Sequence, residues 1–472
     1  MRTDCNSSKL TFPALGSRRV EADFDAGRVT SNAGLLLVSQ AADTVKLFDR
    51  VAACFDDKRA AWRTEHTVRD LVAQRVLGLV AGYEDLNDHD ALRSDPALAA
   101  AVGKHRPMGD GRRDARDNGF ALASASTLGR LENAKAGVAA NRRDLKVAHD
   151  EDALAKLFVE LFIEAQASEP ESIILDFDAT DIPLHGNQEG KFFHGYYRSY
   201  CYLPLYVFCG EHLLAATLRT ANRDGADGAL ETLQQLVEQL RAVWPTTRIT
   251  VRADSGFCRD ALLTWCEAEP GVEYVMGLPR NQRLAEHVDV HRDELTKEVE
   301  ETQKPARRYE DFRYRTRKSW SAERRVVGKA EALPGKWNPR FVVTSLPAEE
   351  WSAERLYKEL YCARGDMENR IKEQQLGMFA DRASNRSLRG NQLRLTFSGL
   401  AYTALVLLRR LGLQSTSMAR AQVWTLRNKL VKIGALVTQS VRRVRVSMSS
   451  SFPHQALYRL AQRRVSRAEV RG

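Results

Sequence analysis

Three acidic residues stand where a chain could assemble a catalytic carboxylate cluster: Asp178 in LDFDATD, Asp254 in RADSG and Glu368 in GDMENRIKE. Three converging carboxylates repel one another unless cations neutralise them. Oxygen-only ligands suit Mg²⁺ or Mn²⁺, which keep several waters and take one or two carboxylates each. Two such ions about 4 Å apart are the usual device for in-line attack on a phosphodiester. The predicted chemistry is metal-dependent cleavage of nucleic acid, with two Mg²⁺ ions held by these three side chains.

The stretch YCARGDMENRIKE, read as a helix, places Tyr361, Arg364 and Glu368 on one face at steps of three and four. Lys372 and Gln375 extend the same stripe. One interpretation is a solvated helix supported by ion pairs between residues four apart. The other is a functional face, on which Glu368 binds metal and Tyr361, Arg364 and Lys372 contact DNA phosphate or hold the carboxylate.

Helical geometry limits which acid of this stretch can join the cluster. At roughly 100° per residue, Asp366 lies about 200° and Glu373 about 140° around the helix from Glu368. Neither can face the two aspartates if Glu368 does. We therefore predict Glu368 as the third ligand.

Two short apolar runs are predicted to carry the aspartates. In ESIILDFDATD, the alternation of a strand puts Asp176 and Asp178 on one face and the apolar residues on the other. Asp176 is therefore the alternative to Asp178 as a ligand. The run RITVRADSG forms a later strand that ends at Asp254, although Asp-Ser-Gly is also ordinary turn chemistry. If these two strands are neighbours, Asp178 and Asp254 lie side by side.

The remaining patterns predict an α/β chain in three parts. Residues 1–165 read as mostly helical, with a capping box at Thr67 and Asp70 and a stop at Gly82. Residues 166–412 read as a mixed sheet with helices. They include YRSYCYLPLYVFCG as a single strand, and a basic β ribbon, ARRYEDFRYRTRKSWSAERRVV, within a β-rich insertion at about 290–346. Residues 413–472 form a basic C-terminal segment.

The charge of the chain is concentrated near its end. The 472 residues carry a net charge of +10, whereas the stretch from Ala401 onward holds fourteen Lys and Arg and one acid. Such a block suits a polyanion, most simply double-stranded DNA, although a solubilising tail has the same composition. We expect Arg442, Arg443 and Arg445 to contact DNA.

Composition also indicates the class of protein. The hydrophobic fraction of 43 % is ordinary for a soluble chain, and no uncharged apolar run is long enough for a membrane span. Seven cysteines without a zinc-binding spacing indicate reduced thiols, and the N-terminus lacks a signal peptide. We expect a cytoplasmic protein without a membrane partner.

Four separated passages and the helix stripe resemble one family of proteins. The spacing Tyr361-x2-Arg364-x3-Glu368 is similar to the Y-R-E signature of DDE-type transposases of bacterial insertion sequences. The passages LVAQRVLGLVAGYEDLNDHDALRSDPAL, ASASTLGRLEN, LDFDATDIPLHGNQEG and LRNKLVKIGALV resemble the insertion sequence 1380 family more narrowly. The resemblance implies a ribonuclease-H-like catalytic domain with a β-rich insertion, and Mg²⁺-dependent cleavage at transposon ends.

Three further positions, Gln375, Trp320 and His185, lie in or near the motifs of this resemblance. The signature of the wider group continues to a lysine at the position of Gln375, so the phosphate contact of that lysine either passes to Lys372 or is absent. Trp320 lies in the basic ribbon, and in hairpin-forming relatives an aromatic residue of this insertion stacks on a base. The alternative for Trp320 is packing against the catalytic domain. His185 is interpreted as a loop residue, because imidazole matches Mg²⁺ poorly.

The sequence thus predicts a cut-and-paste DNA transposase that binds the terminal repeats of its element as a dimer assembled on DNA. The helical domain 1–165 is expected to bind DNA, and the basic segment 413–472 to serve DNA binding or dimerisation. A metal-dependent nuclease or recombinase that cuts without joining is an alternative. A DNA-binding protein with a decayed catalytic domain is another, against which the three intact acids count. Glycoside hydrolysis by paired carboxylates fits poorly with the basic composition.

Overall fold

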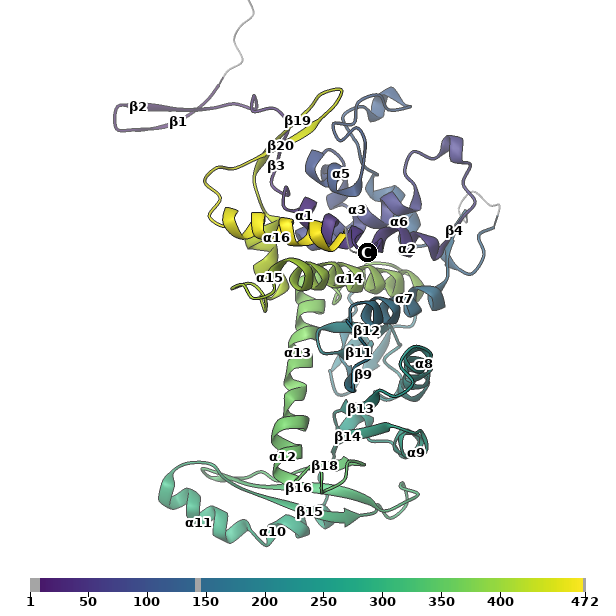
Figure 1. Cartoon of the computed structure of the whole chain (residues 1–472), viewed down its shortest axis with the longest axis vertical. Helices are drawn as coiled ribbons and strands as arrows, with labels where there is room; N and C mark the ends of the chain where they lie inside the picture. Colours follow the sequence, from purple (N-terminus) through teal and green to yellow (C-terminus); the bar gives the residue numbers. More distant parts are fainter. Residues whose placement is uncertain (1–8, 141–145, 470–472) are drawn as a thin grey trace, which may run out of the picture. The chain divides into compact units, whose positions relative to one another are not determined.

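The computed structural model describes residues 9–140 and 146–469, which form two compact units (Figure 1). Unit 1 comprises residues up to 48, 62–129 and 407 onward, and unit 2 comprises 49–61 and 130–406. Most of the N-terminal helical region therefore belongs to one unit with the basic C-terminal segment, although they lie at opposite ends of the sequence. The division does not follow the domain boundaries predicted at 165 and 412.

Unit 2 is built on a nine-stranded mixed sheet. Its strands, in spatial order, are β12 (His212–Thr217), β11 (Leu205–Cys209), β7 (Ser172–Ala179), β13 (Arg248–Ala253), β14 (Val272–Leu278), β18 (Arg340–Thr344), β16 (Arg324–Leu333) and β15 (Ala306–Tyr314), with β17 (Lys336–Trp337) paired to β16. Strands β7, β13 and β14 are mutually parallel, and the other neighbours are antiparallel. The prediction of a mixed α/β fold is confirmed.

Helices cover one face of this sheet because the strands present alternate apolar residues to it. Ile173, Leu175 and Phe177 of β7 enter the main hydrophobic core, as the alternation predicted. This core also contains residues from α7 (Glu151–Glu164), α8 (Ala229–Arg241), α9 (Asp260–Ala268), α10 (Gln282–Asp289) and α11 (Arg292–Thr302). The last two helices pack on the β15–β16 ribbon (Figure 1).

A single helical segment, residues 353–377, packs on the opposite face. It consists of α12 (Ala353–Arg355), a π-helical turn Leu356–Tyr361, a 3₁₀ turn Cys362–Arg364, α13 (Gly365–Lys372) and a second π-helical turn Glu373–Gly377. Leu356, Tyr357 and Leu360 pack on Val275, Val327 and Val342 of the sheet. The helix predicted here is confirmed, but its irregular turns were not expected. Helix α14 (Leu388–Leu408) follows it.

One predicted strand is wrong in detail. The run YRSYCYLPLYVFCG breaks at Leu203 and Pro204 into β10 (Ser199–Tyr202) and β11, because proline lacks the amide hydrogen that a ladder needs. Strand β11 joins the large sheet, whereas β10 lies between β8 (Ile182–Pro183) and β9 (Phe192–His194) in a separate small sheet. Another small sheet in this unit contains β4 (Phe55–Asp57), β6 (Val147–His149) and β5 (Lys135–Ala136).

Unit 1 packs helices from both ends of the sequence together. Helix α1 (Leu35–Asp43) contacts α3 (Val68–Ala81), α5 (Pro96–Val102) and α16 (Gln455–Glu469). The capping box of α3 is present as predicted, and the helix ends at Gly82, whose φ is 93°. The remaining helices are α2 (Leu47–Ala53), α4 (Asp88–Leu92), α6 (Ala125–Glu132) and α15 (Val423–Leu426), of which α2 and α6 extend across the unit boundaries.

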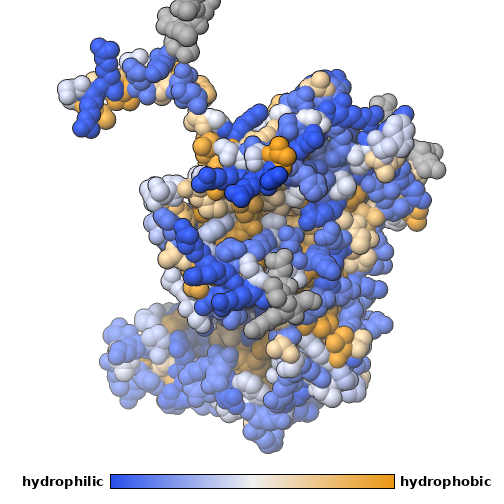
Figure 2. Space-filling model, turned by 45° about the horizontal axis from the view of Figure 1, so that its top comes forward, coloured by the Kyte–Doolittle hydropathy of each residue, from blue (hydrophilic) through white to orange (hydrophobic). Residues whose placement is uncertain are grey.

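Two hairpins complete unit 1. Strands β1 (Leu10–Leu15) and β2 (Arg18–Ala22) form an almost fully exposed hairpin, while β19 (Ala435–Gln439) pairs with both β20 (Val444–Met448) and β3 (Val29–Thr30). The face of the molecule in Figure 2 is largely hydrophilic, with hydrophobic side chains in scattered groups. Across the described residues, no helix is both long enough and apolar enough to cross a membrane.

Candidate active site

The two aspartates lie at matching ends of neighbouring parallel strands. Ala253 of β13 is in register with Phe177 of β7, so Asp178 and Asp254, each the next residue, are adjacent across the ladder. Neighbouring strands are about 4.8 Å apart, which brings two side chains on the same face close together. The adjacency follows from the pairing of the two strands that the sequence analysis considered. Asp254 also accepts a hydrogen bond from the Gly256 amide at 2.8 Å, the turn contact foreseen for Asp-Ser-Gly.

Glu368 on α13 is joined to this strand end by Arg364. The guanidinium of Arg364 donates to Asp178 Oδ2 at 3.1 Å and to Glu368 Oε1 at 3.0 Å. The Arg364 and Asp178 side chains are mostly buried, while that of Glu368 is 53 % exposed. The ion pair between Arg364 and Glu368 is the one that a solvated helix would make, but here the same arginine also reaches the sheet.

The electrostatics of Asp178 reflect its burial and the charges of its neighbours. Burial, together with the charges of Asp254 and Glu368, raises the pKa of Asp178 to about 6, although Arg364 acts in the opposite direction. Burial would lower the pKa of Arg364, but Asp178, Tyr361, Asp254 and Glu368 together outweigh it and the pKa is raised. The negative charges of Asp254 and Glu368 thus act on Asp178, and the positive charge of Arg364 partly offsets them.

A close approach of helix to sheet sets the position of Tyr361. A Cβ atom at Gly277 of β14 would lie 2.7 Å from the Tyr361 hydroxyl oxygen and 2.8 Å from the Ser255 amide nitrogen. Only glycine leaves room for this contact. Burial raises the pKa of Tyr361, and the neighbouring Asp254 adds to the shift. Tyr361 therefore lies beside the turn that carries Asp254.

Asp176, the alternative ligand, is committed to another partner. Arg252 of β13 binds it through two hydrogen bonds, Nε to Oδ1 at 2.5 Å and Nη2 to Oδ2 at 2.8 Å, and both side chains are buried. The remaining guanidinium nitrogen of Arg252, Nη1, donates to the carbonyl oxygen of Leu360 at 2.6 Å. Leu360 lies in the π-helical turn before Tyr361, so the Asp176–Arg252 pair ties the sheet to the helix that carries Glu368.

Sequence reasoning missed Arg252. Its signal was a lone arginine in the run ITVRAD, at a position that shares a strand face with Asp254. A buried charge of this kind requires a partner. The pairing itself depends on the strand register, in which Arg252 faces Asp176.

Gln375 lies near the site at the position where the wider group has lysine. Its side-chain amide donates to Thr180 Oγ1 at 3.3 Å and to the Asp181 carbonyl at 3.0 Å, in the turn after Asp178. Lys372 is exposed on the same helical segment. His185 is also exposed, in the loop after β8, where the sequence analysis put it.

Trp320 is buried in this structure, with 5 % of its surface exposed. It packs edge-on against Tyr314, with ring centroids 5.9 Å apart, and the guanidinium carbon of Arg324 lies 5.3 Å from its ring centre. This is the packing arrangement that the sequence analysis considered as the alternative. Stacking of Trp320 on a base stays a prediction and would require the ring to leave these contacts.

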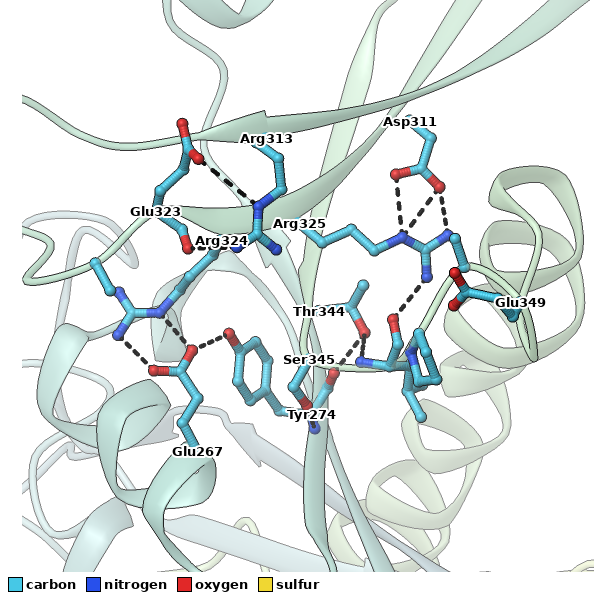
Figure 3. Close-up of a pocket in the computed structure, with 14 residues that line it drawn as sticks. Glu267, Tyr274, Asp311, Arg313, Glu323, Arg324, Arg325, Thr344, Ser345 and Glu349 are labelled. Atoms are coloured by element: carbon cyan, nitrogen blue, oxygen red, sulfur yellow. Dashed lines mark hydrogen bonds and ion pairs between the residues drawn. The ribbon is translucent and has the colours of Figure 1, made fainter.

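The two arginines that begin β16 also have fixed partners. Figure 3 shows Arg324 held by Glu267, and Arg325 held by Asp311, around a pocket beside β16. Arg325 donates further to the carbonyls of Leu346 and Trp351, each at 2.7 Å. These contacts tie β16 to α9 and to the segment after β18.

The three arginines predicted to bind DNA lie together on one exposed hairpin of unit 1. Arg442 and Arg443 occupy the turn between β19 and β20, and Arg445 follows on β20. All three are exposed. Contact with DNA at this hairpin stays a prediction.

The donor set of the site suits a hard divalent cation, but the ligands are not gathered around one point. Within residues 9–140 and 146–469, no group of three or more His, Cys, Asp or Glu side chains is arranged to hold a metal ion. Arg364 explains why the carboxylates do not surround one point, because it lies between Asp178 and Glu368 and forms an ion pair with each. Carboxylate oxygens at Asp178, Asp254 and Glu368 are nevertheless the ligands that Mg²⁺ prefers.

Comparison with known proteins gives one match over nearly the whole chain. The family model described as "Transposase DDE domain group 1" matches residues 12–470. Among solved structures, the chain is similar to a piggyBac transposase synaptic complex with hairpin DNA, at a TM-score of 0.41 and 10 % identity, over 85 % of this chain and 80 % of that chain. No curated protein matches the chain.

Proposed function

Since the chain belongs to the transposase DDE domain group 1 family, we propose that it is a cut-and-paste DNA transposase of the insertion sequence 1380 type, whose Y-R-E helix carries Glu368. It binds the terminal inverted repeats of its element, cleaves the DNA strands at the ends and joins them to a target. The proposed setting is the bacterial cytoplasm, on DNA that assembles two copies of the chain. One observation carries the proposal: Asp178 and Asp254 end neighbouring parallel strands, and Arg364 links Asp178 to Glu368.

The proposed catalytic domain is the ribonuclease-H-like mixed sheet of unit 2. Asp178, Asp254 and Glu368 would hold two Mg²⁺ ions, for which Mn²⁺ would substitute. When bound, such ions supply charge neutralisation and Lewis acidity at a scissile phosphate. The raised pKa of Asp178 reflects burial and like charge, the environment that a cation relieves.

The chain's own residues would position the reacting groups. Arg364 would exchange its contact with Glu368 for one with a DNA phosphate, since its planar guanidinium suits both carboxylate and phosphate oxygens. Tyr361 would hold the turn at Asp254 or contact the phosphate. Lys372, exposed one helical turn beyond Glu368, would approach the same strand of DNA.

The decisive experiment compares two isosteric variants of one helix. Glu368→Gln keeps the shape of the side chain and removes its charge, so Mg²⁺-dependent cleavage of a plasmid carrying the element's ends should fall by about a thousandfold or more. End binding, measured by gel shift, should stay within a few fold. Asp366→Asn is the matched control, because Asp366 is exposed and lies about 200° around an ideal helix from Glu368.

Glu373→Gln is a poorer control, because Glu373 is fully buried beside Arg370 at 3.3 Å and its loss would disturb folding. Cleavage lost in Asp366→Asn and kept in Glu368→Gln would refute the assignment. Joined products in the same reaction separate a transposase from a nuclease that only cuts.

A further inference from the structure

The hairpin β9–β10 concentrates aromatic side chains next to the candidate active site. The run KFFHGYYRSY, residues 191–200, contains five Phe or Tyr in ten residues, against 8 % aromatic residues in the whole chain. Strands β9 and β10 pair so that Phe193 stands directly opposite Tyr200. Such enrichment on two short strands would normally mark a buried core.

These rings are instead exposed. Phe193 is 57 %, Tyr200 50 % and Tyr196 84 % exposed. A group of large apolar side chains on the surface costs solvation free energy and typically marks a binding site. The hairpin therefore has a face that a partner would cover.

The exposed face is ordered by its own contacts. The Phe193 and Tyr200 rings meet at nearly right angles, with centroids 5.5 Å apart. Lys191 Nζ lies 4.8 Å from the centre of the Tyr200 ring and donates to the Gly186 carbonyl at 2.9 Å. Rings held in this way lose little conformational entropy when a flat partner stacks on them.

The hairpin is attached to the strand end that carries Asp178. Strand β10 pairs with β8, and Cys201 lies opposite Pro183. In the sequence, three residues separate Asp178 from the start of β8. From the turn of the hairpin, the Tyr197 hydroxyl donates to the carbonyl of Ala179 at 3.4 Å. The aromatic face and the candidate catalytic carboxylate thus belong to one continuous piece of structure.

The chemistry of the face fits a nucleobase with its phosphate. Aromatic rings stack on bases, and the cations Lys191 and Arg198, the latter exposed in the turn, suit the backbone. A base in a duplex keeps its faces stacked on its neighbours, so only an unpaired nucleotide offers a free ring face. Nucleotides at a cut strand end, which have lost a stacked neighbour, supply such faces.

We propose that the hairpin β9–β10 is a stacking platform that holds unpaired nucleotides of the DNA beside the phosphodiester that Asp178, Asp254 and Glu368 cleave. The inference rests on the proposed function, because it takes the substrate to be DNA. It assigns base contacts to Phe193, Tyr196 and Tyr200, and phosphate contacts to Lys191 and Arg198.

The test compares two DNA probes with the full-length chain by fluorescence anisotropy at one salt concentration. The probes are fluorescein-labelled oligothymidylate of about 20 nucleotides and a duplex of equal length and mixed sequence. Phe193→Ala, Tyr196→Ala and Tyr200→Ala should each weaken oligothymidylate binding by about fivefold to about a hundredfold. Duplex binding should change by less than about twofold, because duplex affinity rests on phosphate contacts.

Two controls make the result specific to ring stacking. Phe193→Trp and Tyr200→Phe keep an aromatic face and should retain the affinity for oligothymidylate. Val243→Ala removes an apolar side chain that is 54 % exposed after α8, and should change neither probe's affinity. Thermal melting by circular dichroism verifies that every variant is folded.

The outcomes separate this inference from the proposed function. Unchanged oligothymidylate affinity in all three alanine variants, with Mg²⁺-dependent cleavage intact in the wild type, overturns the platform alone. Equal losses on both probes also overturn it, because the rings would then not distinguish unpaired bases. If the variants alter the molecular mass in light scattering while DNA binding is unchanged, a second copy of the chain covers the face. A wild-type chain that neither binds nor cleaves DNA refutes the proposed function itself.

Discussion

The β15–β16 ribbon and the β9–β10 hairpin are both rich in aromatic and basic residues, and both belong to unit 2. In the ribbon, Trp320 and Tyr314 are buried, and Arg324 is held by Asp260 at 2.6 Å and Glu267 at 2.7 Å. In the hairpin, Phe193 and Tyr200 are exposed.

The difference teaches that composition alone does not identify a DNA-binding surface. Two carboxylates of α9 hold Arg324 in the ribbon, and the aromatic residues Trp320 and Tyr314 are buried beside it. The hairpin has no comparable cover among the described residues, since its rings remain exposed. We therefore expect a structural role for the ribbon, which packs against α9, and a binding role for the hairpin, whose rings are exposed.

The largest expected difference between the ribbon and the hairpin is in their contribution to the free energy of unfolding. Trp320→Ala should lower the free energy of unfolding by about 3–5 kcal/mol, because it empties a buried aromatic site. Denaturation of the full chain in urea measures this loss, and Trp320→Phe should recover part of it. Unchanged stability together with impaired late steps of DNA cleavage would break the comparison, since Trp320 would then act on DNA.

Arg324→Met should destabilise the chain by about 2–3 kcal/mol, because it leaves the carboxylates of Asp260 and Glu267 without their cation. The matched control is Arg313→Met on the same ribbon. Arg313 is exposed and pairs with Glu323 at 3.8 Å, so its loss should cost less than about 1 kcal/mol. Thermal melting measures the stability of both variants. Equal losses of stability would show that the buried Arg324 contributes no more to stability than the exposed Arg313.

Salt dependence should distinguish phosphate contacts from stacking. Arg443→Gln, on the exposed β19–β20 hairpin, should reduce the slope of log affinity against log salt for duplex DNA by about one unit, as should Arg442→Gln and Arg445→Gln. Tyr200→Ala should leave this slope unchanged, because stacking releases no counterions. A slope unaffected by all three arginine substitutions would show that this hairpin does not contact DNA.

The smallest expected effect is on the stability of the aromatic hairpin. Tyr196→Ala should change the free energy of unfolding by about 0.5 kcal/mol or less, because this ring is 84 % exposed. The measurement is the same urea denaturation used for Trp320. A loss comparable to that of Trp320→Ala would make the hairpin a structural element rather than a binding face.

Local periodicity was enough to predict the elements of the candidate site. Alternation in ESIILDFDATD determined which face of β7 carries Asp178, and the capping box predicted where α3 begins. Helical spacing put Arg364 and Glu368 on one stripe, where they form an ion pair at 3.0 Å. These features depend on residues close in sequence, so the backbone geometry of a single element determines them.

The aromatic hairpin escaped sequence analysis because one proline changed the topology. Read as alternation, YRSYCYLPLYVFCG is a single strand, and its tyrosines then belong to a buried sheet. Pro204 interrupts the ladder, and the first half of the run pairs instead with β8 and β9. Which sheet each half joins depends on pairing with distant strands, and the residues of the run do not identify those strands.

The amino-acid sequence by itself determined the acids, their strands and helix, and the basic C-terminal block. Only the tertiary structure decided that Arg252 links Asp176 to the carbonyl of Leu360, that Trp320 is buried, and that the two ends of the chain share one compact unit. The physical reason is sequence separation. Hydrogen bonds within a turn or along one helix face follow from neighbouring residues, whereas the partner of a buried charge or ring comes from a distant segment and is chosen by packing.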